Sequence, residues 1–259
     1  MKHVLLFNRR IEVVRLASAH PRPDAPAMLF LHEGLGSVAM WRDFPQRISY
    51  ATGCEAVVFS RAGYGSSDPI DAPRTVRYMH DEALIVLPAL IDALELERPI
   101  LFGHSDGGSI ALIHAGAAKQ KLSGVIAMAP HVLVEDISVA SIAAAKTMYM
   151  TTDLRERLAR YHRNVDSAFW GWNDIWLHPD FRYWNIEEYL PTIDCPVLAI
   201  QGEDDEYGTM AQIDRVARGA RDVDLVKLAD CRHSPHKDQP AAVIDAAAQF
   251  TARILDNRQ

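Results

Sequence analysis

A serine flanked by glycines is the residue of this sequence whose setting most directly suggests chemistry. Ser105 lies in Gly103-His104-Ser105-Asp106-Gly107-Gly108, between the apolar run 100–102 and an apolar helical pattern from Ile110 onward. A G-x-S-x-G motif between a strand and a helix predicts a sharp, strained turn that exposes a serine hydroxyl, and its glycines avoid side-chain clashes. The turn also places Ser105 at the start of a helix, where backbone N–H groups stabilise an oxyanion. We therefore predict that Ser105 is a nucleophile.

A nucleophilic serine needs a base, because its hydroxyl is a weak nucleophile at neutral pH, and it needs a group that orients that base. Two histidines, His233 and His236, follow the apolar run 225–228, and four consecutive carboxylates occupy positions 203–206 after the run 197–200. A His-x-x-His pair also raises the question of a metal, but no carboxylate or cysteine pattern completes a site, so we predict none.

Short apolar runs alternate with longer helical patterns along the chain, which is typical of βαβ units. Strands are expected at 4–7, 11–16, 27–31, 56–59, 100–102, 125–128, 197–200 and 225–228, and helices near 77–96, 106–119, 209–219 and 240–255. Continuous apolar strands indicate a sheet that is covered on both faces. We predict an α/β fold with a mostly parallel central sheet, helices on both faces, and an antiparallel hairpin of the first two strands at its edge.

Residues 131–190 interrupt this alternation. They contain no buried-strand run, but they hold Trp170, Trp172, Trp176 and Trp184, four of the five tryptophans. Such side chains bury large areas and need a surface to pack on, so the segment is either an aromatic subcore or a cap over a pocket. We expect a helical cap insertion at 131–190, with residues 1–130 and 191–259 forming the core, and with Trp170, Trp172 and Trp176 contacting a substrate.

Five motifs in order make the chain resemble the α/β-hydrolase superfamily, close to small-molecule esterases, enol-lactonases and meta-cleavage hydrolases. They are LFLHEGLGS at 29–37, FSRAGYGSSD at 59–68, GHSDGG at 103–108, IQGEDD at 200–205 and CRHSPHKDQP at 231–240. Members of that family carry serine, acid and histidine in this chain order. The resemblance implies the α/β-hydrolase fold and a triad of Ser105, Asp205 and His233. Asp204 is the alternative acid, and His236, the alternative base, is otherwise expected to be a solvated loop residue.

The same resemblance implies an oxyanion hole made by the backbone N–H groups of Gly34 and Asp106. The family commonly has His-Gly where this chain has His32-Glu33, so the first donor is Gly34 or a residue next to it. The Glu33 side chain is either solvated or contacts the substrate or the segment at Arg61. We expect the glycine-rich loop 61–67 to serve backbone geometry, because no nucleotide-binding lysine or acidic residue follows at the required spacing.

Composition excludes several classes of protein. With 27 Lys and Arg against 34 Asp and Glu, the net charge of −7 provides no overall positive field for nucleic acid or anionic lipid. Cys54, Cys195 and Cys231 are odd in number and far apart, which favours a reducing compartment. The apolar run 4–7 is too short for a signal peptide or a membrane span. We predict a cytoplasmic protein with no nucleic-acid or membrane partner, and we make no prediction of its oligomeric state.

These observations predict an enzyme that hydrolyses a small carboxylic ester, thioester or lactone through an acyl-enzyme, without a cofactor. The tryptophans of the expected cap favour an apolar or aromatic substrate. A carbon–carbon bond hydrolase of the meta-cleavage type is one alternative, although its glycine-rich oxyanion loops match Glu33 poorly. A non-catalytic ligand-binding module is another, since fold alone does not establish activity, but the complete triad argues against it.

Overall fold

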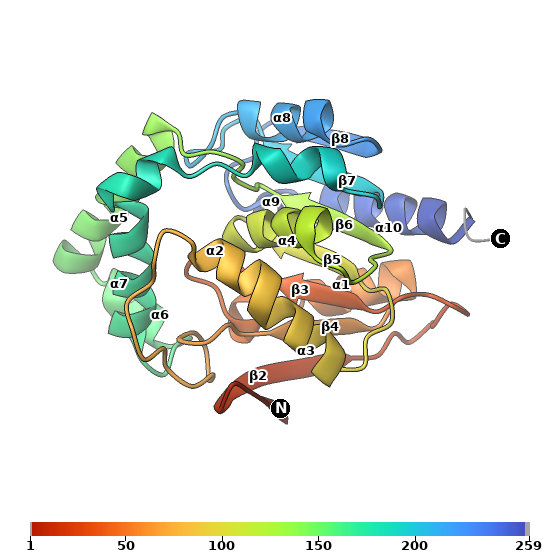
Figure 1. Cartoon of the computed structure of the whole chain (residues 1–259), viewed down its shortest axis with the longest axis horizontal. Coiled ribbons are helices and arrows are strands. Elements are labelled where there is room, and N and C mark those ends of the chain that lie inside the picture. Colours follow the sequence, from red (N-terminus) through yellow and green to blue (C-terminus); the bar gives the residue numbers. More distant parts are fainter. Residues whose placement is uncertain (1, 257–259) are drawn as a thin grey trace.

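The computed structural model describes residues 2–256, which fold around one eight-stranded sheet (Figure 1). Its strands are β1 (Lys2–Leu6), β2 (Arg9–Leu16), β3 (Met28–Leu31), β4 (Ala56–Phe59), β5 (Ile100–His104), β6 (Gly124–Met128), β7 (Val197–Gly202) and β8 (Val223–Leu228). Their order across the sheet is β1-β2-β4-β3-β5-β6-β7-β8. Only the β1–β2 and β2–β4 pairs are antiparallel. The predicted mostly parallel sheet with an antiparallel edge hairpin is therefore confirmed.

Helices cover both faces of the sheet (Figure 1). One face is covered by α1 (Phe44–Thr52) and α10 (Pro240–Asp256), which pack against each other. The other face is covered by α3 (Leu87–Ala93), α4 (Asp106–Ala117) and α8 (Ala211–Gly219). The remaining short elements of the core are η1 (Val38–Trp41), α2 (Tyr78–Asp81), η2 (Glu82–Val86) and α9 (Pro235–Asp238).

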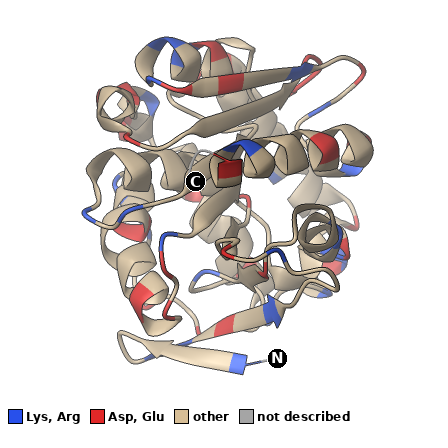
Figure 2. Ribbon diagram, turned by 90° about the vertical axis from the view of Figure 1, so that its right-hand side faces the viewer, with Lys and Arg blue, Asp and Glu red and all other residues tan. Residues whose placement is uncertain are grey.

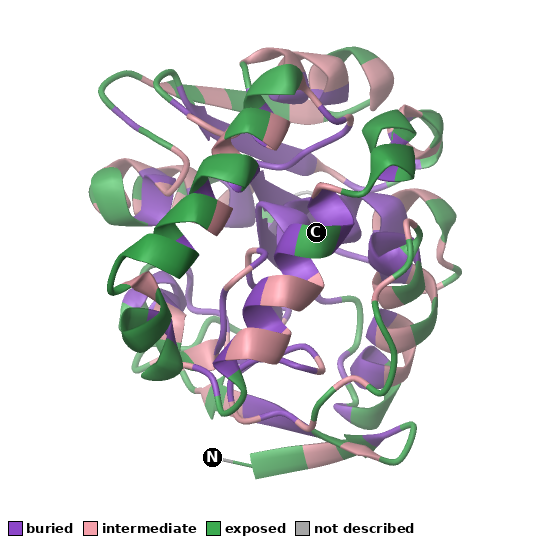
Figure 3. Ribbon diagram, turned by 90° about the vertical axis from the view of Figure 1, so that its left-hand side faces the viewer, coloured by how far each residue is buried: buried purple, intermediate pink, exposed green. Residues whose placement is uncertain are grey.

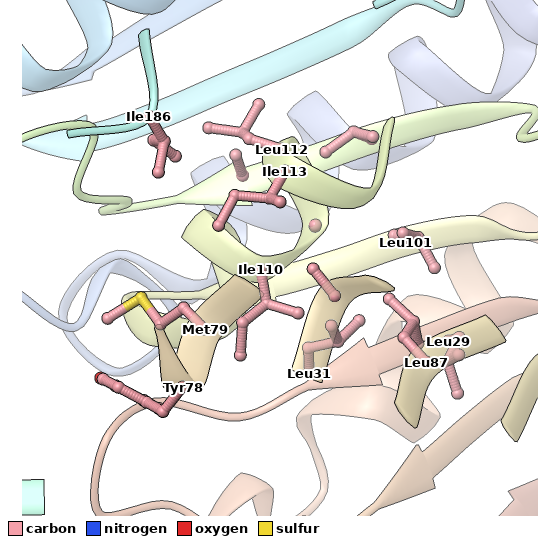
Figure 4. Packing of buried hydrophobic residues seen from close by; sticks show 14 of the residues in the cluster. Leu29, Leu31, Tyr78, Met79, Leu87, Leu101, Ile110, Leu112, Ile113 and Ile186 are labelled. Carbon is pink, nitrogen blue, oxygen red and sulfur yellow. The ribbon is translucent and has the colours of Figure 1, made fainter. Parts of the chain in front are cut away.

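The apolar runs of the central strands arise because successive side chains point to opposite faces of the sheet. In β3, Met28 and Phe30 pack with the α1 and α10 layer, whereas Leu29 and Leu31 pack with the α3 and α4 layer. Figure 4 shows Leu29 and Leu31 on this second face, near side chains of α3 and α4. Every residue of β3 is buried, so the strand end that precedes the loop 32–37 is fixed in place by both layers.

Two elements differ from the sequence-based expectation. β8 is an edge strand with no fully buried residue, although its apolar residues predicted a covered strand. The helix expected at 77–96 is divided into α2, the π-helical turn η2 and α3. Pro88 lies in the first turn of α3 and has no N–H to donate to the preceding turn. That preceding turn is η2, a π turn of the kind that occurs as single turns within α-helices.

The chain between β6 and β7 forms helices that lie beside the carboxyl ends of the strands, on the left in Figure 1. They are α5 (Asp136–Thr151), α6 (Leu154–Ala159), α7 (Val165–Trp176) and η3 (Pro179–Tyr183), and the following η4 (Glu187–Thr192) packs against α4 and α8. In Figure 3 this side of the molecule faces the viewer, with exposed and buried residues alternating along its helices. The two ends of the segment meet, because the Ile186 N–H donates to the Val132 carbonyl oxygen at 2.9 Å.

The surface carries charges of both signs. On the side shown in Figure 2, Lys and Arg are interspersed with Asp and Glu along the helices and loops. Within residues 2–256, no helix combines the length and the apolar character that crossing a bilayer requires.

Candidate active site

Ser105 occupies a strained turn between β5 and α4. Its backbone angles, φ 53° and ψ −119°, are rarely adopted by a residue with a side chain and are typical of functional turns. The turn is held by a hydrogen bond from the Ser105 N–H to the Met128 carbonyl oxygen at 2.9 Å. Gly107 is required by close approach, because a β-carbon there would lie 2.1 Å from the Leu31 carbonyl oxygen. The turn thus presents the Ser105 hydroxyl beyond the end of the sheet.

The predicted base, His233, and the predicted acid, Asp205, form a continuous chain of hydrogen bonds with the Ser105 hydroxyl. His233 Nε2 is 3.0 Å from Ser105 Oγ, and His233 Nδ1 is 2.8 Å and 3.0 Å from the two carboxylate oxygens of Asp205. These distances suit transfer of the serine proton to His233, with Asp205 holding the imidazole in the correct tautomer.

The surroundings of Asp205 keep it ionised. Burial opposes ionisation, but hydrogen bonds from His233 and from the Tyr207 N–H outweigh it and hold the pKa of Asp205 below its usual range. Gln201 Nε2 donates to the second carboxylate oxygen at 3.1 Å. The neighbouring Asp204 is exposed to solvent.

His236 was expected in a solvated loop, and that expectation is wrong. It lies on α9, is 6% exposed, and packs against the rings of Trp41, Phe44 and His104. Burial lowers its pKa to about 2, so the ring is neutral at physiological pH. Trp41 also packs against Phe44 and His104 in this cluster.

A cavity of about 180 Å³ opens over the Ser105 hydroxyl. Its lining includes Gly34 and Asp106, the two predicted oxyanion donors. The Asp106 N–H belongs to the first residue of α4, where helix N–H groups have no partner within the helix. The remaining lining residues are Glu33, Leu35, His104, His131, Ile142, Trp172, Trp176, Glu206, Tyr207, His233 and Ser234.

The three tryptophans predicted to contact substrate are divided between two hollows. Trp172 and Trp176 are one helical turn apart on α7, and both line the cavity over Ser105. Trp172 lies so close to the loop 32–37 that a β-carbon on Gly34 would be 2.1 Å from its Nε1. Trp170 lines a separate hollow of about 470 Å³ against residues 70–74, because two residues along a helix rotate a side chain to nearly the opposite face.

The Asp106 side chain has buried partners that the sequence did not indicate. One carboxylate oxygen accepts a hydrogen bond from the Tyr78 hydroxyl at 2.7 Å, and the other accepts one from Trp176 Nε1 at 3.3 Å. Arg61 Nη2 lies 3.7 Å from the carboxylate, and both side chains are 1% exposed. Asp106 therefore connects the Ser105 turn to α2 and α7.

Glu33 is largely buried beside the cavity. Its carboxylate lies 3.6 Å from His104 Nδ1, and its backbone carbonyl oxygen accepts a hydrogen bond from Arg61 Nη2 at 3.0 Å. Burial opposes ionisation, but the contact with His104 outweighs it and places the pKa of Glu33 well below its usual range. Glu33 thus contacts the segment at Arg61 through its backbone, while its carboxylate is at the cavity wall.

Within the described part of the chain, no group of three or more His, Cys, Asp or Glu residues has an arrangement that would hold a metal ion.

The comparisons with known proteins agree with this architecture. The model of the "Alpha/beta hydrolase family" matches residues 28–246, well over half of the sequence. The chain belongs to the α/β-hydrolase family. A search of curated proteins finds no match.

Solved structures of similar architecture cover nearly the whole of this α/β-hydrolase. A proline iminopeptidase of Mycobacterium smegmatis has a TM-score of 0.79 and 18% identity, over 100% of this chain and 99% of its own. An enol-lactonase of Burkholderia xenovorans has a TM-score of 0.75 and 18% identity, over 96% and 99%. A carboxylesterase of the Thaumarchaeon Nitrososphaera gargenis has a TM-score of 0.75 and 16% identity, over 96% of both chains. At these identities the similarity establishes the fold.

Proposed function

We propose that this protein is a serine hydrolase that cleaves a small apolar or aromatic carboxylic ester, thioester or lactone without a cofactor. The observation that carries the proposal is the hydrogen-bonded row of Ser105, His233 and Asp205 at the base of a cavity walled by tryptophan. The hydrolase family of the chain supports the reaction class, and the ester or lactone specificity is our inference.

In the first half of the reaction, His233 Nε2 takes the proton of the Ser105 hydroxyl as Oγ attacks the substrate carbonyl. The carbonyl oxygen becomes an oxyanion, for which the N–H groups of Gly34 and Asp106 are the donors. Because both donors belong to the backbone, they require little reorganisation as the charge develops. The His233 imidazolium then protonates the leaving alkoxide or thiolate, and the acyl group remains on Ser105.

In the second half, neutral His233 removes a proton from water, which attacks the acyl-enzyme carbonyl. The same two N–H groups hold the second oxyanion, and return of the proton to Ser105 Oγ releases the acid. Asp205 stays ionised throughout and stabilises the imidazolium, consistent with the lowered pKa of its carboxyl group.

The cavity supports a small substrate. Its volume of about 180 Å³ is below the range of about 300–1,000 Å³ that is usual for drug-sized ligands. Leu35, Ile142, Trp172 and Trp176 provide apolar wall. Since the last three come from residues 131–190, we propose that this segment is the cap and that residues 1–130 and 191–259 form the catalytic core.

The proposal is tested by hydrolysis of 4-nitrophenyl esters of increasing acyl length, with the Ser105→Ala variant as the control. We expect turnover of acetate and butyrate, a decline with longer acyl chains, and loss of turnover in the variant. A fluorophosphonate should add its mass to the tryptic peptide that contains Ser105.

Two results would contradict the proposal. Undiminished turnover in a folded Ser105→Ala variant would exclude Ser105 as the nucleophile. A folded wild-type protein that neither hydrolyses the esters nor reacts with fluorophosphonate would favour a ligand-binding module, whereas labelling without ester turnover would favour carbon–carbon cleavage.

A further inference from the structure

The peptide group between Glu33 and Gly34 has two functions in this site. Its N–H is the first oxyanion donor of the proposed reaction, and its carbonyl oxygen belongs to Glu33. A trans peptide is planar, so its N–H and its carbonyl point in opposite directions. A side chain that fixes the position of the Glu33 carbonyl oxygen therefore also fixes the direction of the Gly34 N–H.

Two buried side chains hold that carbonyl oxygen. Arg61 Nη2 donates to it at 3.0 Å, and His32 Nδ1 lies 2.7 Å away. The backbone N–H of Arg61 donates to His32 Nε2 at 3.0 Å, which leaves the proton of the neutral imidazole on Nδ1. Burial keeps the pKa of His32 well below its usual value, so His32 is a neutral donor. Of the two side chains that contact the Glu33 carbonyl oxygen, Arg61 is the one that carries a positive charge.

The guanidinium of Arg61 also faces the second oxyanion donor residue. It lies 3.7 Å from the Asp106 carboxylate, with both side chains almost fully buried. A buried carboxylate on the residue that supplies an oxyanion donor would repel the developing negative charge. The positive charge of Arg61 offsets that repulsion at close range.

Packing alone does not explain this arginine. Its Nε and Nη1 atoms are buried and have no hydrogen-bond partner among the described residues, an arrangement that natural cores usually avoid. Sequence reasoning assigned the glycine-rich loop that begins at Arg61 to backbone geometry. The contacts of the Arg61 side chain add a second role.

We propose that Arg61 is the positioning residue of the oxyanion hole: it aims the Gly34 N–H through the Glu33 carbonyl oxygen and balances the charge of Asp106. This inference rests on the proposed serine hydrolase function. Arg61 touches neither the substrate nor Ser105, so it acts through the two donor residues. It should therefore matter more for the tetrahedral transition state than for the bound ester.

The chain contains a matched control residue. Arg74 is also a buried arginine, and the guanidiniums of Arg61 and Arg74 both lie 5.1 Å from the centre of the Tyr64 ring. Arg74 donates to the Ala62 carbonyl oxygen and lies near Glu82. Within residues 2–256 it makes no hydrogen bond or ion pair with either oxyanion donor residue.

The test compares Arg61→Met and Arg61→Lys with Arg74→Met and Arg74→Lys. Each variant is assayed for kcat and KM on the best 4-nitrophenyl ester and for inhibition by an alkylboronic acid, whose adduct with serine is tetrahedral and anionic. Removing a direct oxyanion donor typically costs about 100- to 1,000-fold in kcat. An indirect effect should be smaller, so we expect Arg61→Met to lose about 10- to 100-fold in kcat with little change in KM.

Boronate affinity should fall in parallel with kcat/KM, because such adducts resemble the transition state. Arg61→Lys retains the positive charge but not the planar guanidinium with its several N–H donors. We therefore expect its losses of kcat and of boronate affinity to be smaller than those of Arg61→Met. The Arg74 variants should keep kcat within about twofold and leave boronate affinity unchanged. If Arg61→Met does not fold, the pair of lysine variants decides the question.

The proposal is overturned if folded Arg61 variants keep wild-type kcat, or if Arg61 and Arg74 variants lose activity equally. A fall in kcat with unchanged boronate affinity overturns it as well, because the effect would then lie outside the oxyanion hole. These results differ from failure of the proposed function itself, in which turnover would persist in Ser105→Ala or would be absent from the wild type.

Discussion

Asp205 and Asp204 are adjacent carboxylates with different environments. Asp205 is buried and accepts hydrogen bonds from His233, Tyr207 and Gln201. Asp204 is exposed, and its backbone N–H donates to the Cys231 carbonyl oxygen. Only the first can orient His233, so the two residues form a natural pair for mutagenesis.

We expect Asp205→Asn to fold but to lose about 1,000- to 10,000-fold in kcat, because an amide favours the wrong histidine tautomer and leaves the imidazolium unbalanced. Asp204→Asn is the matched control and should keep kcat within about twofold, as surface substitutions usually do. Steady-state kinetics on a 4-nitrophenyl ester distinguish them. Equal rates in the two variants would exclude Asp205 as the triad acid.

Asp106→Asn tests the buried ion pair next to Ser105. The amide removes the charge that faces Arg61, and breaking a buried pair typically costs about 3–5 kcal/mol of unfolding free energy. We expect a loss near the lower end, about 3 kcal/mol, since Tyr78 and Trp176 still contact the side chain. Urea unfolding measures it. Asp153→Asn, at an exposed pair with Arg157, should change stability by less than about 1 kcal/mol, and a similar loss in both variants would contradict the prediction.

The order of motifs led to Ser105, Asp205 and His233 because each follows the end of a strand, and the structure brings these three residues into contact. Arg61 and Tyr78 were not found in the same way. Their contacts with Asp106 span 45 and 28 positions in sequence, and no local pattern indicates which distant partner a buried polar side chain will meet. His236 was misplaced for the same reason, because its burial depends on packing against Trp41 and Phe44.

At the scale of elements, α7 determines the shape of the cavity. Trp172 and Trp176 face Ser105, and Trp170 faces the hollow against residues 70–74. Truncating Trp172 should enlarge the cavity, and truncating Trp170 should not.

We therefore expect Trp172→Ala to shift the preferred acyl chain toward greater length, raising the kcat/KM of the hexanoate ester relative to that of the acetate by about tenfold, the effect of one to two well-packed methylenes. Trp170→Ala controls for loss of an aromatic residue from the same helix. Its ratio should stay at the wild-type value. An unchanged ratio in Trp172→Ala, or an equal change in both variants, would mean that this wall does not limit the acyl chain.

Central strands were predicted to within about two residues because burial on both faces demands a continuous apolar run. The burial of β8 was overestimated, since an apolar run does not reveal that a strand lies at the edge of the sheet. The division of the helix at 77–96 had a visible cause in Pro88, but a proline in a sequence does not distinguish a π turn from a kink or an end. Trp170, Trp172 and Trp176 were all predicted to contact a substrate, and only the helix rotation separates Trp170 from the other two.

At the scale of the whole molecule, burial of histidines links stability to pH. Burial lowers the pKa of six histidines, namely His32, His80, His114, His131, His162 and His236. In the unfolded chain their pKa values return to about 6.5. Below that pH the unfolded state binds more protons than the folded state, so the free energy of unfolding falls as pH falls.

We expect the free energy of unfolding, measured by urea titration, to decrease steadily from pH 7 to pH 4. His236→Phe keeps an aromatic ring against Trp41 and Phe44 but removes a group whose pKa is lowered to about 2. Its slope near pH 5 should be shallower than that of the wild type by about 1.4 kcal/mol per pH unit, the value for one proton. Identical slopes would show that His236 takes up its proton in the folded state.

The placement of the tryptophans also gives the molecule an optical property. Four of its five indoles lie between residues 131 and 190, and two of them face the Ser105 hydroxyl. The emission of Trp172 and Trp176 therefore originates at the cavity wall, and we expect it to change whenever a substrate occupies the cavity. Occupancy can be followed in real time by stopped-flow emission, in unlabelled Ser105→Ala protein and with esters that carry no chromophore.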